Sequence, residues 1–314
     1  MNDVNDMKGG GVFHDRGQKV TLAWATHVGL VRGHNEDSCG FNIPESQELL
    51  SGRGALTMVA DGMGGAVGGA TASKLVVHTV IEQYYQHPSP DPAAALHDAI
   101  SQANQVVHMQ GAGGQGPRMG STCTAVVIRD GMAYFGHVGD TRAYLIRDHA
   151  ILQLTDDHSK VAQMVRDGYI TADQAELHPE RNVILRSVGP KPQVEVDTGK
   201  VDIRPKDRLL ICSDGLSGLC GDVEMLEIVE NNIPSEAVTK LVRLANERGG
   251  HDNITVQVIE YGAQRRAAST ELEIPVVGAP RTQAPPTMAP ITAPRRGSGA
   301  LVGALLGGVV ALGA

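Results

Sequence analysis

The stretch Leu56–Gly65 reads Leu-Thr-Met-Val-Ala-Asp-Gly-Met-Gly-Gly and decides how the rest of the chain is interpreted. An apolar run that ends at Asp61-Gly62 is typical of a buried strand that carries one carboxylate to the end of a sheet. Glycines after the carboxylate let the backbone come close to whatever the carboxylate binds. Asp61 is therefore the first candidate for a functional residue.

The same arrangement recurs further along the chain. Ala133–Asp140 and Arg208–Asp214 are also apolar runs that end in an aspartate, and Asp252 stands just before another apolar run. Glu36 and Asp37 add two adjacent acids. Carboxylates that meet at one place raise one another's pKa unless cations lie between them. Hard oxygen ligands of this kind suit Mg²⁺ or Mn²⁺ rather than zinc.

Bulk composition indicates a globular protein and excludes some classes of partner. The chain has 314 residues, of which 41% are hydrophobic, enough for one large domain or two small ones. A formal net charge of -8 argues against a nucleic-acid partner. The four cysteines show no paired C-x-x-C spacing, which favours reduced thiols over disulfides or a zinc site. With no apolar run near the N-terminus to indicate a signal peptide, we expect a cytoplasmic catalytic domain.

The composition divides the chain into segments. Residues 1–18, rich in Gly, Asp and Asn, are expected to form a disordered leader, and residues 19–262 a single catalytic domain. Residues 263–299 are rich in Pro, Ala and Thr, which predicts an extended linker.

The tail, residues 300–314, is apolar and uncharged, and Arg295-Arg296 precedes it. It is marginally short of the roughly 20 residues that a membrane-spanning helix needs. One interpretation is an anchor that tethers the domain to the inner face of the membrane, with the arginines on the cytoplasmic side. The alternatives are a disordered end, an end docked on a partner, or the start of a longer chain.

Local patterns predict an α+β fold. Cys123–Arg129 and Met132–Val138 are joined by Asp130-Gly131, which indicates a tight antiparallel hairpin. Helical spacing comes in pairs, first in Ala70–Tyr85 and Pro92–Gln110, and later in Val223–Asn231 and Pro234–Arg248. We therefore expect a four-layer α/β/β/α sandwich, with two central antiparallel sheets flanked by helix pairs. Short helices within about residues 160–190 indicate a small flap subdomain beside the site.

Eight motifs then occur in a characteristic order. They are Arg32-x-x-Asn35-Glu36-Asp37, Val59-Ala-Asp-Gly-Met-Gly-Gly65, Gly120-Ser-Thr122, Gly136-His-Val-Gly-Asp-Thr-Arg142, Leu154-Thr-Asp-Asp-His-Ser159, Arg186-Ser-Val-Gly189, Ser213-Asp-Gly-Leu216 and Asp252-Asn-Ile-Thr255. In order and spacing they resemble the type 2C (PPM) metal-dependent serine/threonine protein phosphatases over about residues 20–260. The flap region resembles the bacterial branch of that family.

The resemblance implies hydrolysis of phosphoserine and phosphothreonine in proteins by a water that two or three Mn²⁺ or Mg²⁺ ions activate. It implies that the chain counteracts a Ser/Thr kinase, so that phosphorylated proteins and that kinase are its expected partners. By this resemblance Asp61, Asp214 and Asp252 hold the first metal, and Asp61 bridges it to the second.

The resemblance also assigns the remaining site residues. The carbonyl of Gly62, together with waters held by Glu36 or Asp37, completes the second metal, and Asp140 joins Asp214 at a third. Arg32 would bind the substrate phosphate with its forked guanidinium. Asn253 and Thr255 would support the loop that presents Asp252. Met63 stands where some eukaryotic relatives carry a histidine, so the sequence names no general acid.

Other interpretations of the same residues stay open. A catalytically silent phosphoprotein-binding pseudophosphatase or scaffold would keep this fold, although none of the three principal aspartates is missing. Cys123-x5-Arg129 matches the cysteine-phosphatase pattern, but within an apolar strand we expect that cysteine to be buried and inert. His137 is expected to orient the turn around Asp140, and His34 and His158 to be structural hydrogen-bonding residues.

Overall fold

The strand expected at the start of the opening stretch is β4 (Ala55–Ala60), and all six of its residues are buried. Successive side chains of a strand point to opposite faces of the sheet. Leu56 and Met58 accordingly belong to one hydrophobic core and Val59 to another. A strand that is covered on both faces needs the uninterrupted apolar sequence found here.

The computed structural model describes residues 10–14, 20–44, 46–111 and 119–262. All of them belong to one unit of the chain, Met1–Ile274, whereas the second unit, Pro275–Ala314, lies outside the described residues. The predicted linker at 263–299 and the predicted apolar tail at 300–314 therefore lie outside them too.

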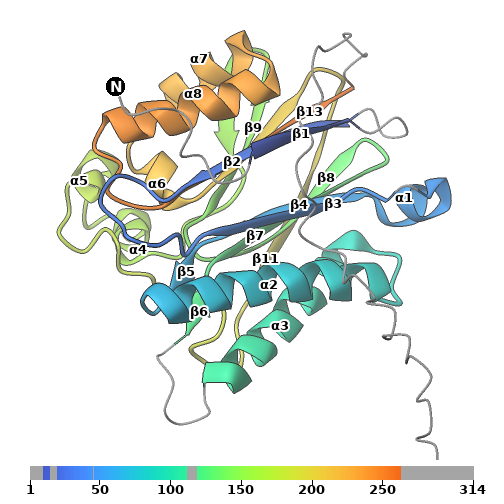
Figure 1. The fold of residues 1–314 in the computed structure, drawn as a ribbon, viewed down its shortest axis with the longest axis horizontal. Coiled ribbons are helices and arrows are strands. Elements are labelled where there is room, and N and C mark those ends of the chain that lie inside the picture. The colour runs from blue at the N-terminus through green and yellow to red at the C-terminus, as the bar shows by residue number, and fades with distance from the viewer. Residues whose placement is uncertain (1–9, 15–19, 45, 112–118, 263–314) are drawn as a thin grey trace, which may run out of the picture. The chain divides into compact units, whose positions relative to one another are not determined.

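Two antiparallel sheets form the centre of the first unit (Figure 1). The first sheet has the order β1-β2-β13-β12-β9-β10. Its strands are β1 (Gly10–His14), β2 (Val20–His27), β9 (Arg142–Arg147), β10 (Ala150–Gln153), β12 (Arg208–Cys212) and β13 (Ile254–Tyr261). The second has the order β11-β8-β7-β4-β3. It adds to β4 the strands β3 (Ser38–Asn42), β7 (Cys123–Arg129), β8 (Met132–Val138) and β11 (Asp197–Asp202).

Helix pairs cover the outer faces of the sheets (Figure 1). α2 (Ala66–Gln86) and α3 (Pro92–Gly111) pack on the second sheet, and α7 (Asp222–Asn231) and α8 (Pro234–Glu247) pack on the first. Asp91 caps the start of α3 by accepting a hydrogen bond from the Ala93 N–H. The predicted four-layer α/β/β/α sandwich is confirmed.

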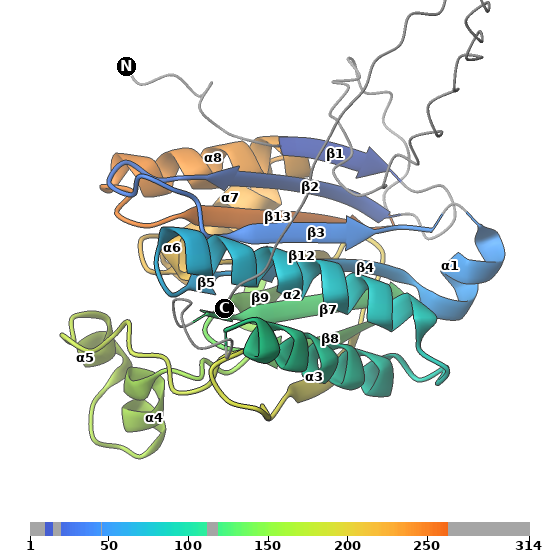
Figure 2. The ribbon, with the colours of Figure 1, turned by 60° about the horizontal axis from the view of Figure 1, so that its bottom comes forward.

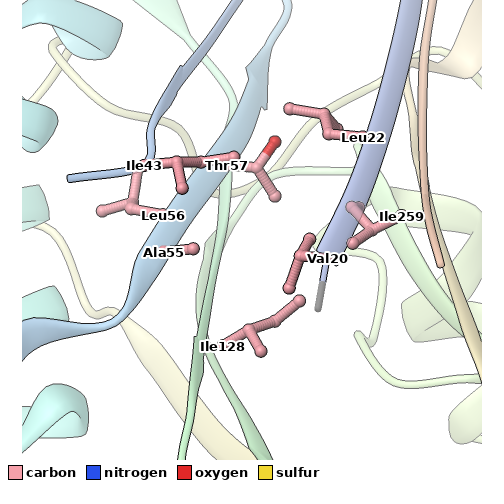
Figure 3. A pocket seen from close by; sticks show the side chains of 8 residues that line it. All are labelled: Val20, Leu22, Ile43, Ala55, Leu56, Thr57, Ile128 and Ile259. Atoms are coloured by element: carbon pink, nitrogen blue, oxygen red, sulfur yellow. The ribbon is translucent and has the colours of Figure 1, made fainter. Parts of the chain in front are cut away.

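The space between the sheets is filled by apolar side chains and one buried polar pair. Thr57 on β4 donates to Gln257 on β13 at 2.5 Å, which links the two sheets. Beside this pair lies a cavity of about 10 Å³, lined by Thr57 and seven apolar residues (Figure 3). A space of this size holds at most one water-sized probe.

The predicted flap is present as a small helical excursion, formed by α4 (Lys160–Arg166) and α5 (Ala172–Glu176). Its two ends meet at an antiparallel bridge between Ser159 and Ile184. Both ribbon views place it at the end of the sandwich that also carries β5 (Gly62–Met63) and the short α6 (Asp214–Ser217) (Figures 1 and 2).

The structure corrects the expected elements at three places. Gly10–His14 pairs with β2, so the predicted disordered leader is wrong for these five residues, because the open edge of β2 supplies backbone partners that the leader alone lacks. The other leader residues lie outside the described part. Ser38–Asn42 and α1 (Gln47–Arg53) were not expected. The short sequence of β3 does not identify it as a strand, and it becomes one through its pairing with β4.

No helix among the described residues is long and apolar enough to cross a bilayer.

The buried polar pair gives a test of the inter-sheet packing. Gln257→Ala leaves the Thr57 hydroxyl without its acceptor and opens a cavity, so we expect the free energy of unfolding in urea to fall by about 2–4 kcal/mol. Gln86→Ala on the exposed face of α2 is the matched control and should change it by less than about 0.5 kcal/mol. The double variant Thr57→Val/Gln257→Leu removes both polar partners and should restore part of the loss. Equal losses in Gln257→Ala and Gln86→Ala would contradict the role given to this pair.

Candidate metal centre

Strand register brings the predicted acids of the second sheet to one end. Ser38, which follows Asp37, pairs with Ala60, which precedes Asp61. Cys123, at the start of β7, pairs with Val138, at the end of β8. Asp37, Asp61 and the turn that carries Asp140 therefore lie at the same end of this sheet.

The first sheet contributes its acids at the same place. Ile254 pairs with His27, and Cys212 pairs with both Val256 and Arg142, so Asp252 and Asp214 lie at one sheet end. The turn that carries Asp140 runs from β8 in one sheet to β9 in the other. This turn joins the two groups of acids, and both ribbon views show α6 beside β5 here (Figures 1 and 2).

Asn253 ties the loop after β2 to the acid that precedes β13. Its side-chain amide donates to the carbonyls of Val28 and His34 at 2.9 Å each, and its Oδ1 accepts from the Glu36 N–H at 2.8 Å. Its own N–H donates to Asp252 Oδ1 at 2.8 Å. These contacts agree with the predicted supporting role of Asn253.

Thr255 and Ser213 hold Asp37. The Ser213 hydroxyl donates to Asp37 Oδ2 at 2.8 Å, and the Thr255 side chain forms a further hydrogen bond to the same carboxylate. The Thr255 N–H in turn contacts the Ser213 oxygen at 3.0 Å. Ser213 has no role in the sequence-based assignment, although it stands in one of the quoted motifs.

The backbone of Asp61 is fixed on both sides. Its N–H donates to Thr122 Oγ1 at 2.8 Å, and its carbonyl accepts from the Thr122 N–H at 2.8 Å and the Ser121 hydroxyl at 2.9 Å. These contacts come from β6 (Gly120–Ser121) and the residue after it. Sequence alone gave Ser121 and Thr122 no function.

Two glycines let α2 approach the loop that carries Glu36. A Cβ on Gly62 would lie 2.2 Å from the Gly69 carbonyl oxygen, and a Cβ on Gly69 would lie 1.8 Å from Glu36 Oε2. Only glycine fits the backbone contact at Gly62, and a side chain at Gly69 would displace the Glu36 carboxylate. Gly62 therefore allows the close packing of the turn after Asp61 against α2 and the Glu36 loop.

Burial and mutual repulsion raise the pKa values of four carboxyl groups. Burial is the largest cause for Asp37, Asp61, Asp140 and Asp214. The neighbouring charge of Asp214 further raises the pKa of Asp61, of Asp140 and of Asp37. The neighbouring charge of Asp252 raises the pKa of Asp214 in turn. The acids thus lie close enough to interact strongly.

Three of these carboxyl groups have an oxygen without a hydrogen-bond partner. Asp37 Oδ1, Asp140 Oδ1 and Asp214 Oδ1 are buried and unpaired, within a total of five such side-chain atoms among the described residues. An unpaired buried acceptor is costly. Hard oxygen donors in this number and state fit divalent cations such as Mg²⁺ or Mn²⁺.

Comparison with known proteins agrees with this geometry. The model of the protein phosphatase 2C family matches residues 32–260. The chain belongs to the protein phosphatase 2C family. It is 34% identical over 242 residues to the serine/threonine phosphatase stp of Listeria monocytogenes, covering 75% of this chain and 93% of that protein. It is 34% identical over 250 residues to the protein phosphatase PhpP of Streptococcus pneumoniae, covering 78% and 99%.

Solved structures give the same result. The Mycobacterium tuberculosis serine/threonine phosphatase PstP/Ppp matches with a TM-score of 0.70 and 34% identity, covering 78% of this chain and 99% of that one. The catalytic domain of a PstP solved with two manganese ions matches with a TM-score of 0.67 and 33% identity, covering 77% and 97%. The resemblance to the bacterial type 2C phosphatases is confirmed.

Within this protein phosphatase 2C domain, Asp252 forms an ion pair with a basic side chain. Arg32 Nη2 lies 2.8 Å from Asp252 Oδ2, and the Arg32 side chain is 48% exposed. Among the residues that the structure describes, no three His, Cys, Asp or Glu side chains form a ready ligand group for one ion. The three aspartates predicted for the first metal lie at the same end of the two sheets, Asp252 is hydrogen-bonded to Arg32, and the ligand roles of all three stay predictions.

The cysteine and histidine predictions have different outcomes. Cys123 is fully buried in β7, and burial raises the pKa of its thiol to about 12, as expected for an inert residue. His137 bonds to Thr124, which in turn donates to the Thr141 carbonyl beside Asp140, so its contact with the turn is indirect, whereas His158 contacts the turn at Gly139 directly. Spacing alone could not distinguish two histidines whose rings lie 4.7 Å apart.

The raised pKa of Asp37 predicts an unusual pH dependence of the stability of the metal-free protein, measured in EDTA. Burial raises its pKa to about 7, above its value in the unfolded chain, so between pH 4 and pH 7 the folded state holds the extra proton. Stability should therefore fall as pH rises through this range, by up to about 1.4 kcal/mol per pH unit for this one group. Urea unfolding at several pH values measures the slope.

Asp37→Asn should flatten that slope, because the asparagine does not titrate. Asp130→Asn is the matched control, since Asp130 is 70% exposed in the hairpin turn at the opposite end of β7 and β8. An unchanged slope in Asp37→Asn would show that this carboxyl group does not titrate as described.

Proposed function

We propose that this chain hydrolyses phosphoserine and phosphothreonine in proteins in a reaction that depends on Mn²⁺ or Mg²⁺. Family membership and the serine/threonine phosphatases among its relatives support the reaction, and the two manganese ions of the related PstP domain support the metal. In the structure, the observation that carries the proposal is the group of unpaired, buried carboxylate oxygens where the two sheets end together.

The proposed ligands divide the acids among the ions. Asp61, Asp214 and Asp252 would hold the first ion, with Asp61 shared by the second. The Gly62 carbonyl, with Glu36 and Asp37 acting through water, would complete the second, and Asp140 would join Asp214 at a third. When bound, such ions supply a nucleophile at neutral pH and neutralise charge on the phosphoryl oxygens.

The protein's own residues would then orient the substrate. Arg32 has five fixed N–H donors, and its exposed side chain lies at the solvent side of the acids. Its guanidinium is anchored to Asp252 at 2.8 Å and can direct its other N–H groups at a phosphate. Asn253, Ser213 and Thr255 would keep Asp252 and Asp37 in place.

The proposed partners are phosphorylated proteins and the Ser/Thr kinase that the enzyme counteracts. Removal of phosphate from a serine or threonine reverses a kinase reaction, so the two activities must act on shared proteins. The tail at 300–314 is proposed to tether the domain to the inner face of the membrane, which rests on its uncharged apolar sequence and on the preceding Arg295-Arg296.

The activity is tested with a phosphothreonine peptide. EDTA should abolish phosphate release, and added Mn²⁺ should restore it. Asp61→Asn and Asp214→Asn should each lower kcat/KM by at least about 100-fold, equivalent to ~3 kcal/mol of transition-state stabilisation. The exposed Asp130→Asn should keep the parental rate. Metal-independent release, or peptide binding without turnover by the parent protein, would refute the proposal, and the latter outcome would identify a pseudophosphatase.

The anchor is tested by fractionating cells that express either the full chain or residues 1–262. We expect the full chain in the membrane pellet and the shorter chain in the supernatant. Replacing Leu301 and Leu305 by Lys in the full chain is the matched control and should release it, because charged residues insert poorly. Equal distribution of all three proteins would remove the anchor.

A further inference from the structure

His158 binds the turn that carries Asp140 at the backbone of Gly139. The His158 backbone N–H donates to the Gly139 carbonyl at 2.7 Å, while the Gly139 N–H donates to His158 Nδ1 at 3.0 Å. A single residue thus contacts both polar groups of Gly139. The imidazole is 5% exposed, so these bonds are shielded from water.

The hydrogen bonds also fix the protonation of the ring. Because Nδ1 accepts a hydrogen bond, the proton of the neutral imidazole lies on Nε2. Nε2 lies 3.0 Å from Asp197 Oδ2, which accepts from it. The other oxygen of Asp197 accepts from Arg186 Nη1 at 2.5 Å. Asp197 therefore selects both the tautomer and the orientation of the ring.

Gly139 is held equally tightly on its other side. Its φ of +114° favours glycine, and a Cβ there would lie 2.6 Å from Thr122 Cβ. Thr122 is the residue whose hydroxyl accepts from the Asp61 N–H. Gly139 thus lies between His158 and Thr122, the residue that positions Asp61. Asp140, whose Oδ1 is unpaired, follows Gly139 directly in the chain.

The same histidine belongs to the base of the flap. Its carbonyl accepts from the Leu185 N–H at 2.8 Å, beside the bridge between Ser159 and Ile184 that closes the flap. Arg142, which follows the turn, forms a forked ion pair with Asp157 at 2.7 Å. The flap base and the Asp140 turn are therefore joined at two points, His158 to Gly139 and Asp157 to Arg142.

We propose that His158, oriented by Asp197, is a positioning residue that fixes the Gly139–Asp140 turn against the base of the flap and so sets the affinity of Asp140 for its cation. The inference rests on the proposed function of Asp140. It assigns His158 no contact with substrate or with the reacting atoms.

Two substitutions of His158 test the roles of its two ring nitrogens separately. Asn places an amide oxygen near the position of Nδ1 and can still accept from Gly139, whereas Gln places its amide near Nε2 and leaves the Gly139 N–H unpaired. We expect His158→Gln to weaken Mn²⁺ binding at the weakest site by about tenfold, the scale of losses for residues that support metal ligands. We expect His158→Asn to stay within about threefold of the parent. Electron paramagnetic resonance of free Mn²⁺ measures the binding without turnover.

Further measurements separate positioning from a general loss of structure. In metal-free protein, the Gly139 amide should exchange at least about tenfold faster in His158→Gln than in His158→Asn. In an Asp140→Asn background, His158→Gln should cause no additional loss of Mn²⁺ binding. His149→Gln, at an exposed turn, is the matched control and should behave as the parent.

The inference is overturned if His158→Gln and His158→Asn weaken Mn²⁺ binding equally, or if the loss persists in the Asp140→Asn background. Should the variants fail to fold, long-range ¹H–¹⁵N correlation of the parent protein decides, because a proton on Nδ1 of His158 excludes the arrangement. These outcomes are distinct from failure of the proposed function, which the parent protein's lack of metal-dependent phosphatase activity would show.

Discussion

Repulsion among buried carboxyl groups is the constraint on which the rest of this structure depends. Asp37, Asp61, Asp140 and Asp214 lie where both sheets end, and burial with mutual repulsion raises their pKa values. The three hydrophobic cores supply the stability that offsets this cost. The hydroxyl and amide groups of Ser213, Thr255 and Asn253 then hold the acids in place, with unpaired oxygens left for cations.

Much of the fold could be predicted because its strands are either strictly apolar or end at an unmistakable turn. β7 and β8 have their predicted bounds, since Asp130-Gly131 separates them and Gly139-Asp140 follows β8. β3 was not predicted, because Cys39 and Phe41 give only a very short alternating pattern, and the segment becomes a strand through its pairing with β4. β1 has the same origin, in pairing with the edge of β2.

The candidate site could be predicted to the level of its acids but not of the bonds that hold them. Strand ends identify Asp61, Asp140 and Asp214, because the chain must present a residue where a buried strand meets solvent. Hydrogen bonds such as Ser213 to Asp37 join residues 176 positions apart, and no spacing in the sequence reports them. The same limit explains why the sequence alone does not assign the direct contact with the Asp140 turn to His158, whose ring lies beside that of His137 only after folding.

The crossing from β8 to β9 makes the Asp140 turn the point where both sheets and the flap meet. Each sheet is rigid, because close-packed apolar cores are hardly compressible and transmit a displacement to their neighbours. The flap contacts the turn through His158, which binds both polar groups of Gly139 and carries the flap-closing hydrogen bond on its carbonyl. A displacement of the flap base would therefore have to break the Gly139 bonds or move Asp140 with it. Thr122, on the opposite side of Gly139, extends this mechanical connection to the backbone of Asp61.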